Sequence, residues 1–197
     1  MRVVLVAVLL GHLTAEQLVV PPPANGIGMT VDARDLDRGL LHAHLAIPAT
    51  GSTLDLAYPR WIPGTHAPGN PVQNLVDLRF HGNGVVLQWD RDEADPWLFH
   101  VTVPPGVATV EADFSYITDQ PADRSSIGAD VHAGQACATI NWNTVLLYPA
   151  GRPVASIPVD LALLLPDGWA LGSALVQSGV PVAGRVCFTR CSLRDLV

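Results

Sequence analysis

The sequence contains no lysine: all 11 of its basic residues are arginine, against 18 acidic residues, and the formal net charge is −7 at pH 7. The arginines are scattered, so no local basic patch offsets the acidic balance. Nucleic acids and anionic lipids attract basic surfaces, and we therefore expect neither as a partner. Only 15% of the residues are charged and 49% are hydrophobic, which indicates a folded domain and excludes a disordered chain.

Cysteine is scarce and odd in number. The three cysteines are Cys137, Cys187 and Cys191, so they cannot form a closed disulfide framework. The last two lie in the segment C-F-T-R-C, which is not the C-x-x-C spacing of redox or zinc-ribbon sites. We predict three ordinary small core residues, with a Cys187–Cys191 disulfide as the alternative.

The amino-terminal apolar run, Val3–Leu10, is too short to span a membrane, which takes about 20 apolar residues. It follows Arg2 and precedes Ala15, which is the order of a secretory signal. We predict a signal peptide over residues 1–15, export to the periplasm or outside the cell, and a proline-rich linker over residues 16–25. A buried strand is the alternative for this run.

Helical periodicity is missing as well, whereas strict alternation of apolar and polar residues recurs. Residues 110–116 place every apolar side chain on one face, and residues 41–47 and 97–103 follow the same pattern. Residues 157–165 are apolar on both faces, which indicates a more central strand. Pro104-Pro105-Gly106 predicts a hairpin between two of these strands. Together the pattern predicts an all-β, antiparallel β-sandwich-like domain over residues 26–190.

No catalytic motif is present: the sequence lacks H-E-x-x-H, G-x-S-x-G, a P-loop and G-x-G-x-x-G. His42 and His44 share one strand face, a possible metal-binding geometry, but two ligands do not make a site and we expect solvent-facing histidines. His100 should also point outward. The acidic residues 90–95 match no calcium loop and indicate a solvated turn.

The most informative segment begins at Tyr58 with Y-P-R-W-I-P-G-T-H, continues with N-L-V-D-L-R-F-H-G-N-G, and reaches D-P-W-L-F-H-V around Trp97. A-T-I-N-W-N-T-V-L-L-Y follows at residues 138–148 and L-P-D-G-W at residues 165–169. In order and spacing these pieces resemble the amino-terminal domain of the glycyl aminopeptidase family of zinc metallopeptidases. The resemblance covers residues 26–197. His66 and the Ala67-Pro68-Gly69 that follows depart from the family pattern.

The resemblance implies that zinc and the catalytic glutamate lie in an H-E-x-x-H motif of a following domain. This chain then has no catalytic residue, no metal ligand and no cofactor of its own; it packs on its catalytic domain and walls the cleft for the peptide substrate. The implied interdomain or cleft loop contains Trp61, Pro63, Gly64, Thr65 and His66. Residues 191–197 would begin the connection, and its docking residues would be Leu193, Leu196 and Val197. A docking face should expose apolar surface, which we expect within Trp61–Pro71 and Val186–Val197.

Two other functions compete. A stand-alone secreted β-sandwich that binds a glycan or a protein would show a row of exposed aromatic residues, but the alternation turns them inward: Trp97, Phe99, Phe114 and Tyr116. A hydrolase would need an ordered triad and an oxyanion hole, and the sequence offers only unordered candidates: Ser125, Ser126, Asp130 and His132.

Overall fold

The computed structural model describes residues 20–61, 68–118, 131–134 and 137–197. The predicted signal peptide therefore lies outside the described residues. Within the described part of the chain, no helix is long and apolar enough to cross a membrane.

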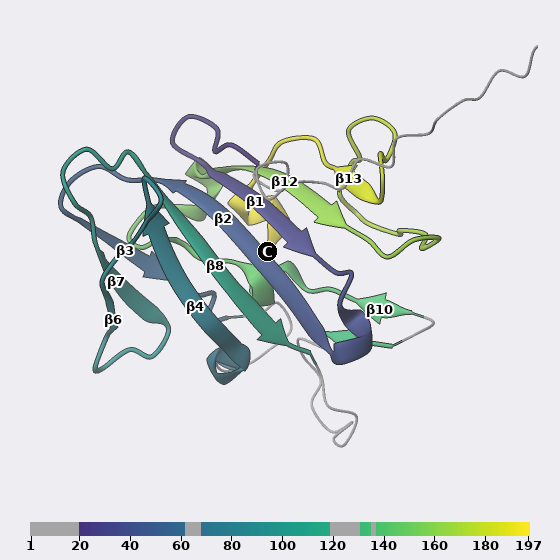
Figure 1. The fold of residues 1–197 in the computed structure, drawn as a ribbon, viewed down its shortest axis with the longest axis horizontal. Coiled ribbons are helices and arrows are strands. Elements are labelled where there is room, and N and C mark those ends of the chain that lie inside the picture. The colour runs from purple at the N-terminus through teal and green to yellow at the C-terminus, as the bar shows by residue number, and fades with distance from the viewer. Residues whose placement is uncertain (1–19, 62–67, 119–130, 135–136) are drawn as a thin grey trace, which may run out of the picture.

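The larger of two main sheets has eight strands in the order β13-β12-β1-β2-β8-β4-β5, with β14 also pairing with β12. Figure 1 shows it as a twisted sheet running across the molecule. Its neighbours pair antiparallel, except that β1 runs parallel to β12. The strands are β1 (Ile27–Asp32), β2 (Leu40–Pro48), β4 (Leu75–Gly82), β5 (Val85–Val86), β8 (Thr109–Ile117), β12 (Pro158–Leu164), β13 (Arg185–Cys187) and β14 (Cys191–Ser192).

The smaller main sheet has four strands in the order β11-β3-β7-β6, and a separate two-stranded ribbon pairs β10 with β9. These strands are β3 (Thr53–Ala57), β6 (Trp89–Arg91), β7 (Leu98–Thr102), β9 (His132–Ala133), β10 (Ala138–Thr139) and β11 (Tyr148–Pro149). Helical segments are short: η2 (Leu36–Arg38), η3 (Val72–Asn74), η4 (Trp142–Val145), η5 (Val154–Ser156) and α1 (Leu193–Leu196). The predicted all-β, sandwich-like class is confirmed.

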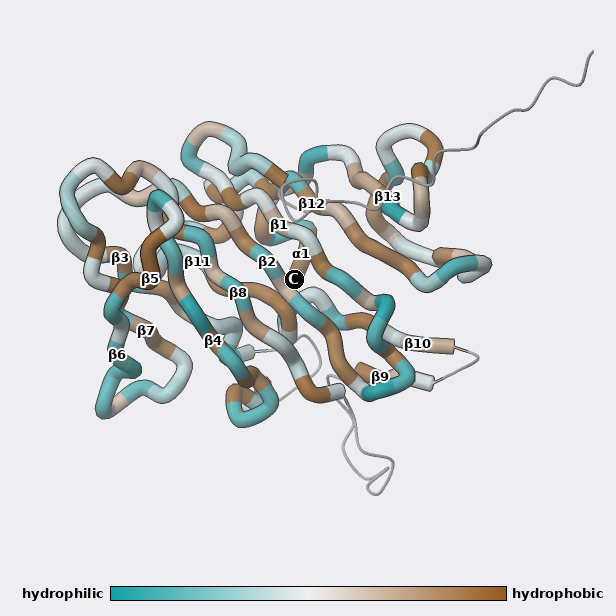
Figure 2. The backbone as a smooth tube through the Cα atoms, in the orientation of Figure 1, coloured by the Kyte–Doolittle hydropathy of each residue, from teal (hydrophilic) through white to brown (hydrophobic). Residues whose placement is uncertain are grey.

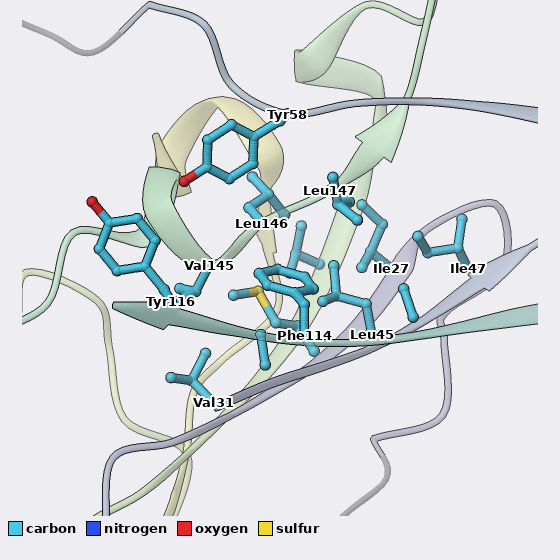
Figure 3. Packing of buried hydrophobic residues seen from close by; sticks show 14 of the residues in the cluster. Ile27, Val31, Leu45, Ile47, Tyr58, Phe114, Tyr116, Val145, Leu146 and Leu147 are labelled. Atoms are coloured by element: carbon cyan, nitrogen blue, oxygen red, sulfur yellow. The ribbon is translucent and has the colours of Figure 1, made fainter. Parts of the chain in front are cut away.

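The alternation in the sequence selects the buried face of the large sheet. In β8 the side chains of Val110, Ala112, Phe114 and Tyr116 are all buried, and β2 buries Leu41, Ala43, Leu45 and Ile47 in the same way. Figure 2 shows the corresponding changes between hydrophobic and hydrophilic colour along β2 and β8. Figure 3 shows side chains of this face, among them Leu45 and Phe114, packed under Tyr58, Leu146 and Leu147. Each large apolar side chain buried this way contributes about 1.5–3 kcal/mol of transfer free energy.

Strand β12 is buried on both faces, as its sequence predicts. Val159, Leu161 and Leu163 belong to the core, and the alternate residues Ala162 and Leu164 are buried as well. The strand lies between β1 on one side and β13 and β14 on the other. A strand with neighbours at both edges and apolar residues on both faces is central to the fold.

The predicted hairpin at Pro104-Pro105-Gly106 is wrong. Strand β7 belongs to the four-stranded sheet, whereas β8 pairs with β2 and β4 in the large sheet. The segment still turns, with Val107 N–H donating to the Pro104 carbonyl and Gly106 at φ 86°, but it carries the chain from one sheet to the other. The two strands alternate alike, so their pattern does not reveal that their partners differ.

The prediction that the cysteines are core residues is also wrong. Cys137 and Cys187 are exposed and Cys191 is half-buried, and all three are free thiols. A Cys187–Cys191 disulfide is incompatible with the sheet register. Cys187 lies opposite Ala162 and Cys191 opposite Val159, so the two thiols sit three positions apart along β12 and on opposite faces. At about 3.3 Å per residue, three positions place the Cα atoms of the two cysteines about 10 Å apart. Cysteines joined by a disulfide have Cα atoms no more than about 7 Å apart.

Candidate interdomain surface

A cavity of about 400 Å³ lies beside the small sheet, where the Trp61 segment meets the end of the chain. We call it the Trp61 cavity. Tyr58 and Trp61 follow strand β3, Trp97 precedes β7, and Tyr148 lies on β11. The lining includes Tyr58, Arg60, Trp61, Trp97, Tyr148 and Val197. The two segments in which we expected the docking face, around Trp61 and at the carboxy terminus, thus share one cavity.

Buried hydrogen bonds hold the inner wall of the Trp61 cavity. The Tyr58 hydroxyl donates to the carbonyl of Thr144 at 2.9 Å, and burial raises the pKa of Tyr58 well above its usual range. Asn70 has 1% exposure; its amide donates to the carbonyls of Pro59 at 2.7 Å and Asn143 at 2.9 Å. These contacts connect the segment after β3 to η4, so the wall is preorganised.

Trp97, which precedes β7, contacts the same wall of the Trp61 cavity from the other side. Its indole Nε1 donates to the Asn70 carbonyl at 3.0 Å. The Arg60 guanidinium lies 5.1 Å from the Trp97 ring centroid, in a cation–π arrangement. Arg60 also forms an ion pair with Asp95. Because the guanidinium is paired with a carboxylate, the mouth of the cavity carries no net charge from these two residues.

Asp95, which pairs with Arg60, lies in a turn that the Asp92 carboxylate holds. The Asp92 carboxylate accepts hydrogen bonds from the backbone N–H groups of Ala94 and Asp95. Residues 92–95 thus form a turn, as predicted, whereas Asp90 and Arg91, which were predicted to share it, belong to strand β6. Asp92 also contacts His100, whose other ring nitrogen contacts Asp55 at 2.8 Å. His100 points outward, which confirms that prediction.

Trp61 is the aromatic side chain that remains exposed at this surface. Its exposed fraction is 58%, and the other large hydrophobic residues exposed in the described part of the chain are all valines: Val85, Val86, Val176, Val180 and Val182. The remaining predicted loop residues, Pro63, Gly64, Thr65 and His66, lie outside the described residues.

The carboxy-terminal residues pack mainly on their own domain. Leu193 is 0% exposed and Leu196 6%, so both side chains pack on the core of this domain, and Leu193 also lines the Trp61 cavity. The docking role implied for them stays a prediction. A capping box between Ser192 and Asp195 begins α1, and the hydrogen bonds from Ser192 lower the pKa of Asp195. Val197 is half-buried and lines the Trp61 cavity.

A second concave region, of about 650 Å³, lies on the polar face of the large sheet. His44 Nδ1 is 2.7 Å from Asp113 Oδ1, and His81 Nδ1 is 3.4 Å from Asp113 Oδ2. Burial alone would raise the pKa of Asp113, but the hydrogen bond from His44 and the charges of both histidines lower it. His42 contacts Ser115 and Asp35 on the same face.

These histidines are partly exposed and bonded within the sheet face, and His42 and His44 do share one face, as predicted. His81 was missed by sequence reasoning because it comes from β4, across β8 from β2. Among the described residues, no group of three or more His, Cys, Asp or Glu side chains could hold a metal ion.

Of the hydrolase candidates, the structure describes only His132. His132 lies exposed on the short strand β9. Ser125, Ser126 and Asp130 lie outside the described residues. The aromatic residues do not form an exposed row either: Phe99, Phe114 and Tyr116 are buried, and Trp97 is half-buried against the core.

Comparison with known proteins identifies the family. The model of the Peptidase M61 N-terminal domain matches residues 28–197. Since this match covers most of the chain, the chain belongs to that family. No curated protein matches the sequence significantly.

A solved structure shares the fold. An aminopeptidase N family protein from Idiomarina loihiensis superposes with a TM-score of 0.71 at 18% identity, covering 86% of this chain and 27% of that protein. An M1 zinc metallopeptidase from Deinococcus radiodurans matches with a TM-score of 0.43 at 11% identity, covering 85% of this chain and 37% of that one. The chain thus spans between about a quarter and two fifths of the length of these structures.

Proposed function

We propose that this chain is the non-catalytic amino-terminal domain of an exported metallopeptidase that resembles glycyl aminopeptidases. In this proposal it packs on the catalytic domain and forms one wall of the cleft for the peptide substrate. The zinc ion and the general base belong to the catalytic domain. The observation that carries the proposal is the match to the Peptidase M61 N-terminal domain over residues 28–197.

Two further observations support it. In the Idiomarina loihiensis structure, which shares this fold, the domain accounts for 27% of the chain, so most of that protein lies outside it. In the chain described above, an apolar cavity opens between Trp61 and Val197, and exposed apolar surface of this kind is typical of docking sites. A stand-alone binding module is the alternative, and the burial of Phe99, Phe114 and Tyr116 argues against an aromatic ligand platform.

The decisive experiment is to sequence the coding DNA downstream of the Val197 codon. An open or frameshifted frame that encodes H-E-x-x-H and a more distant glutamate would support the proposal. A stop codon with no zinc motif downstream would refute it and favour the binding module.

Export is tested separately, by fusing residues 1–25 to a reporter enzyme that is active only outside the cytoplasm. We expect activity from this fusion and none from a fusion with Val6 and Leu9 both changed to Arg, because charges in the apolar run prevent its recognition as a signal. Equal activity from the two fusions would refute export by this segment.

A further inference from the structure

The described surface exposes apolar side chains in three places. Val85 and Val86 form strand β5 at the edge of the large sheet. Val176, Val180 and Val182 lie on a segment that pairs with residues 185–188. Trp61 lies over the Trp61 cavity. Only the third combines an exposed aromatic side chain with a concave, preformed pocket.

The three places differ in the kind of contact they can make. Residues that dominate binding energy at protein interfaces are enriched in Trp, Tyr and Arg and cluster in pockets that exclude water, whereas Val is under-represented among them. The Trp61 cavity has Trp61, Trp97, Tyr148 and Arg60 in its lining. The two valine clusters contain no exposed aromatic residue.

Binding in the cavity should also require little ordering of its wall and leave no charge unpaired. Asn70 and Tyr58 fix its wall through buried hydrogen bonds, so little ordering remains to be done when a partner binds. The Arg60 guanidinium already has Asp95 as its counter-ion. An apolar group that enters therefore leaves no charge without a partner, which avoids the main penalty of burying ionic groups.

We propose that the Trp61 cavity is the anchor site for the catalytic domain of the same peptidase, which inserts one large apolar side chain between Trp61 and Val197. This inference rests on the proposed function. A cavity of about 400 Å³ is at the size of a small binding pocket, which runs from about 300 Å³ upward. It therefore suits one or two side chains better than a folded segment.

The position of Val197 selects this occupant over a second copy of the chain or an unrelated protein. Val197 lines the cavity, so a domain joined to it starts at the rim. Tethering makes docking intramolecular, with an effective concentration in the range of about 1 mM for a short linker. Neither a free partner nor a second copy has this advantage.

The test uses the full-length protein encoded through and beyond codon 197, with Trp61→Ala, Trp61→Phe and the matched surface control Val86→Ala. Limited proteolysis measures cleavage of the linker after Val197, which is protected while the domains are docked. We expect Trp61→Ala to accelerate linker cleavage about tenfold or more, as for loss of an interface hot spot. Trp61→Phe should have a smaller effect, and Val86→Ala should cleave like the parent.

Circular dichroism of each variant checks that the domain still folds, which we expect because Trp61 is mostly exposed. If the gene encodes a zinc domain but Trp61→Ala leaves linker cleavage unchanged, the anchor site is refuted and the proposed function stands. If no such domain is encoded, both are refuted. If sedimentation shows that the parent dimerises and Trp61→Ala does not, the occupant is a second copy and the inference is wrong.

Discussion

Substituting Asn70 tests whether its buried hydrogen bonds stabilise the wall of the Trp61 cavity. Its amide group donates to two buried carbonyls, those of Pro59 and Asn143. Asn70→Ala leaves both carbonyl oxygens without this donor, and each unsatisfied buried group costs about 1–3 kcal/mol. Asn70 Oδ1 is itself buried without a partner among the described residues, and its removal offsets part of this cost. We therefore expect a net destabilisation of about 2–4 kcal/mol.

The assay is urea unfolding of the 197-residue chain at 25 °C, followed by circular dichroism. Asn70→Asp has the same shape but offers only acceptors to the two carbonyls at neutral pH, so it should be at least as destabilising as Asn70→Ala. Asn74→Ala is the control, because its amide makes only a 3.5 Å contact with the Tyr116 hydroxyl. The reasoning fails if Asn70→Ala unfolds at the same urea concentration as Asn74→Ala.

Three other predictions concern the core, the surface charges and the thiols. Phe114→Ala should cost about 3–5 kcal/mol of unfolding free energy by urea denaturation, because Phe114 is 3% exposed at the centre of β8; a cost below about 1 kcal/mol would contradict its place in the core. Hydrogen bonds to Asp55, the larger cause, and to Asp92 raise the pKa of His100 above 6.5. The contribution of these bonds to the stability of the folded state is therefore complete below pH 6.5 and is lost as pH rises through the raised pKa. The melting temperature of the parent relative to His100→Gln should fall over that window, and a constant difference would refute the linkage. Burial raises the pKa of Cys191, so its thiol should react with a maleimide after the other two thiols, and mass spectrometry of partly labelled protein would show the order.

The sequence predicts the parts of this fold that depend on local alternation. Strand β8 could be placed because its apolar residues share one face, and the double-sided burial of β12 follows from its continuous apolar run. Pairing is a different matter, since it depends on contacts between distant segments. The Pro104-Pro105-Gly106 connection was predicted as a hairpin although its flanking strands belong to different sheets.

The same limit applies to side chains gathered from separate strands. The pair His42 and His44 is visible in the sequence because both lie on β2. His81 joins them only because β4 lies across β8, on which Asp113 bridges His44 and His81. The prediction for the cysteines was wrong for a related reason: small apolar residues are usually buried, but Cys187 lies on β13 at the edge of the sheet and is exposed there.

The carboxy terminus shows what sequence reasoning about the docking surface could and could not provide. Leu193 and Leu196 look like exposed apolar residues when they are read as a connecting tail, but α1 turns both inward, with the Leu193 N–H donating to the Ile157 carbonyl. Leu193 and Val197 both line the Trp61 cavity, but Leu193 is fully buried whereas Val197 is partly exposed. Leu193 and Leu196 therefore belong to the core of this domain, and the exposed part of its candidate contact with another domain narrows to Trp61, Val197 and the rim around them.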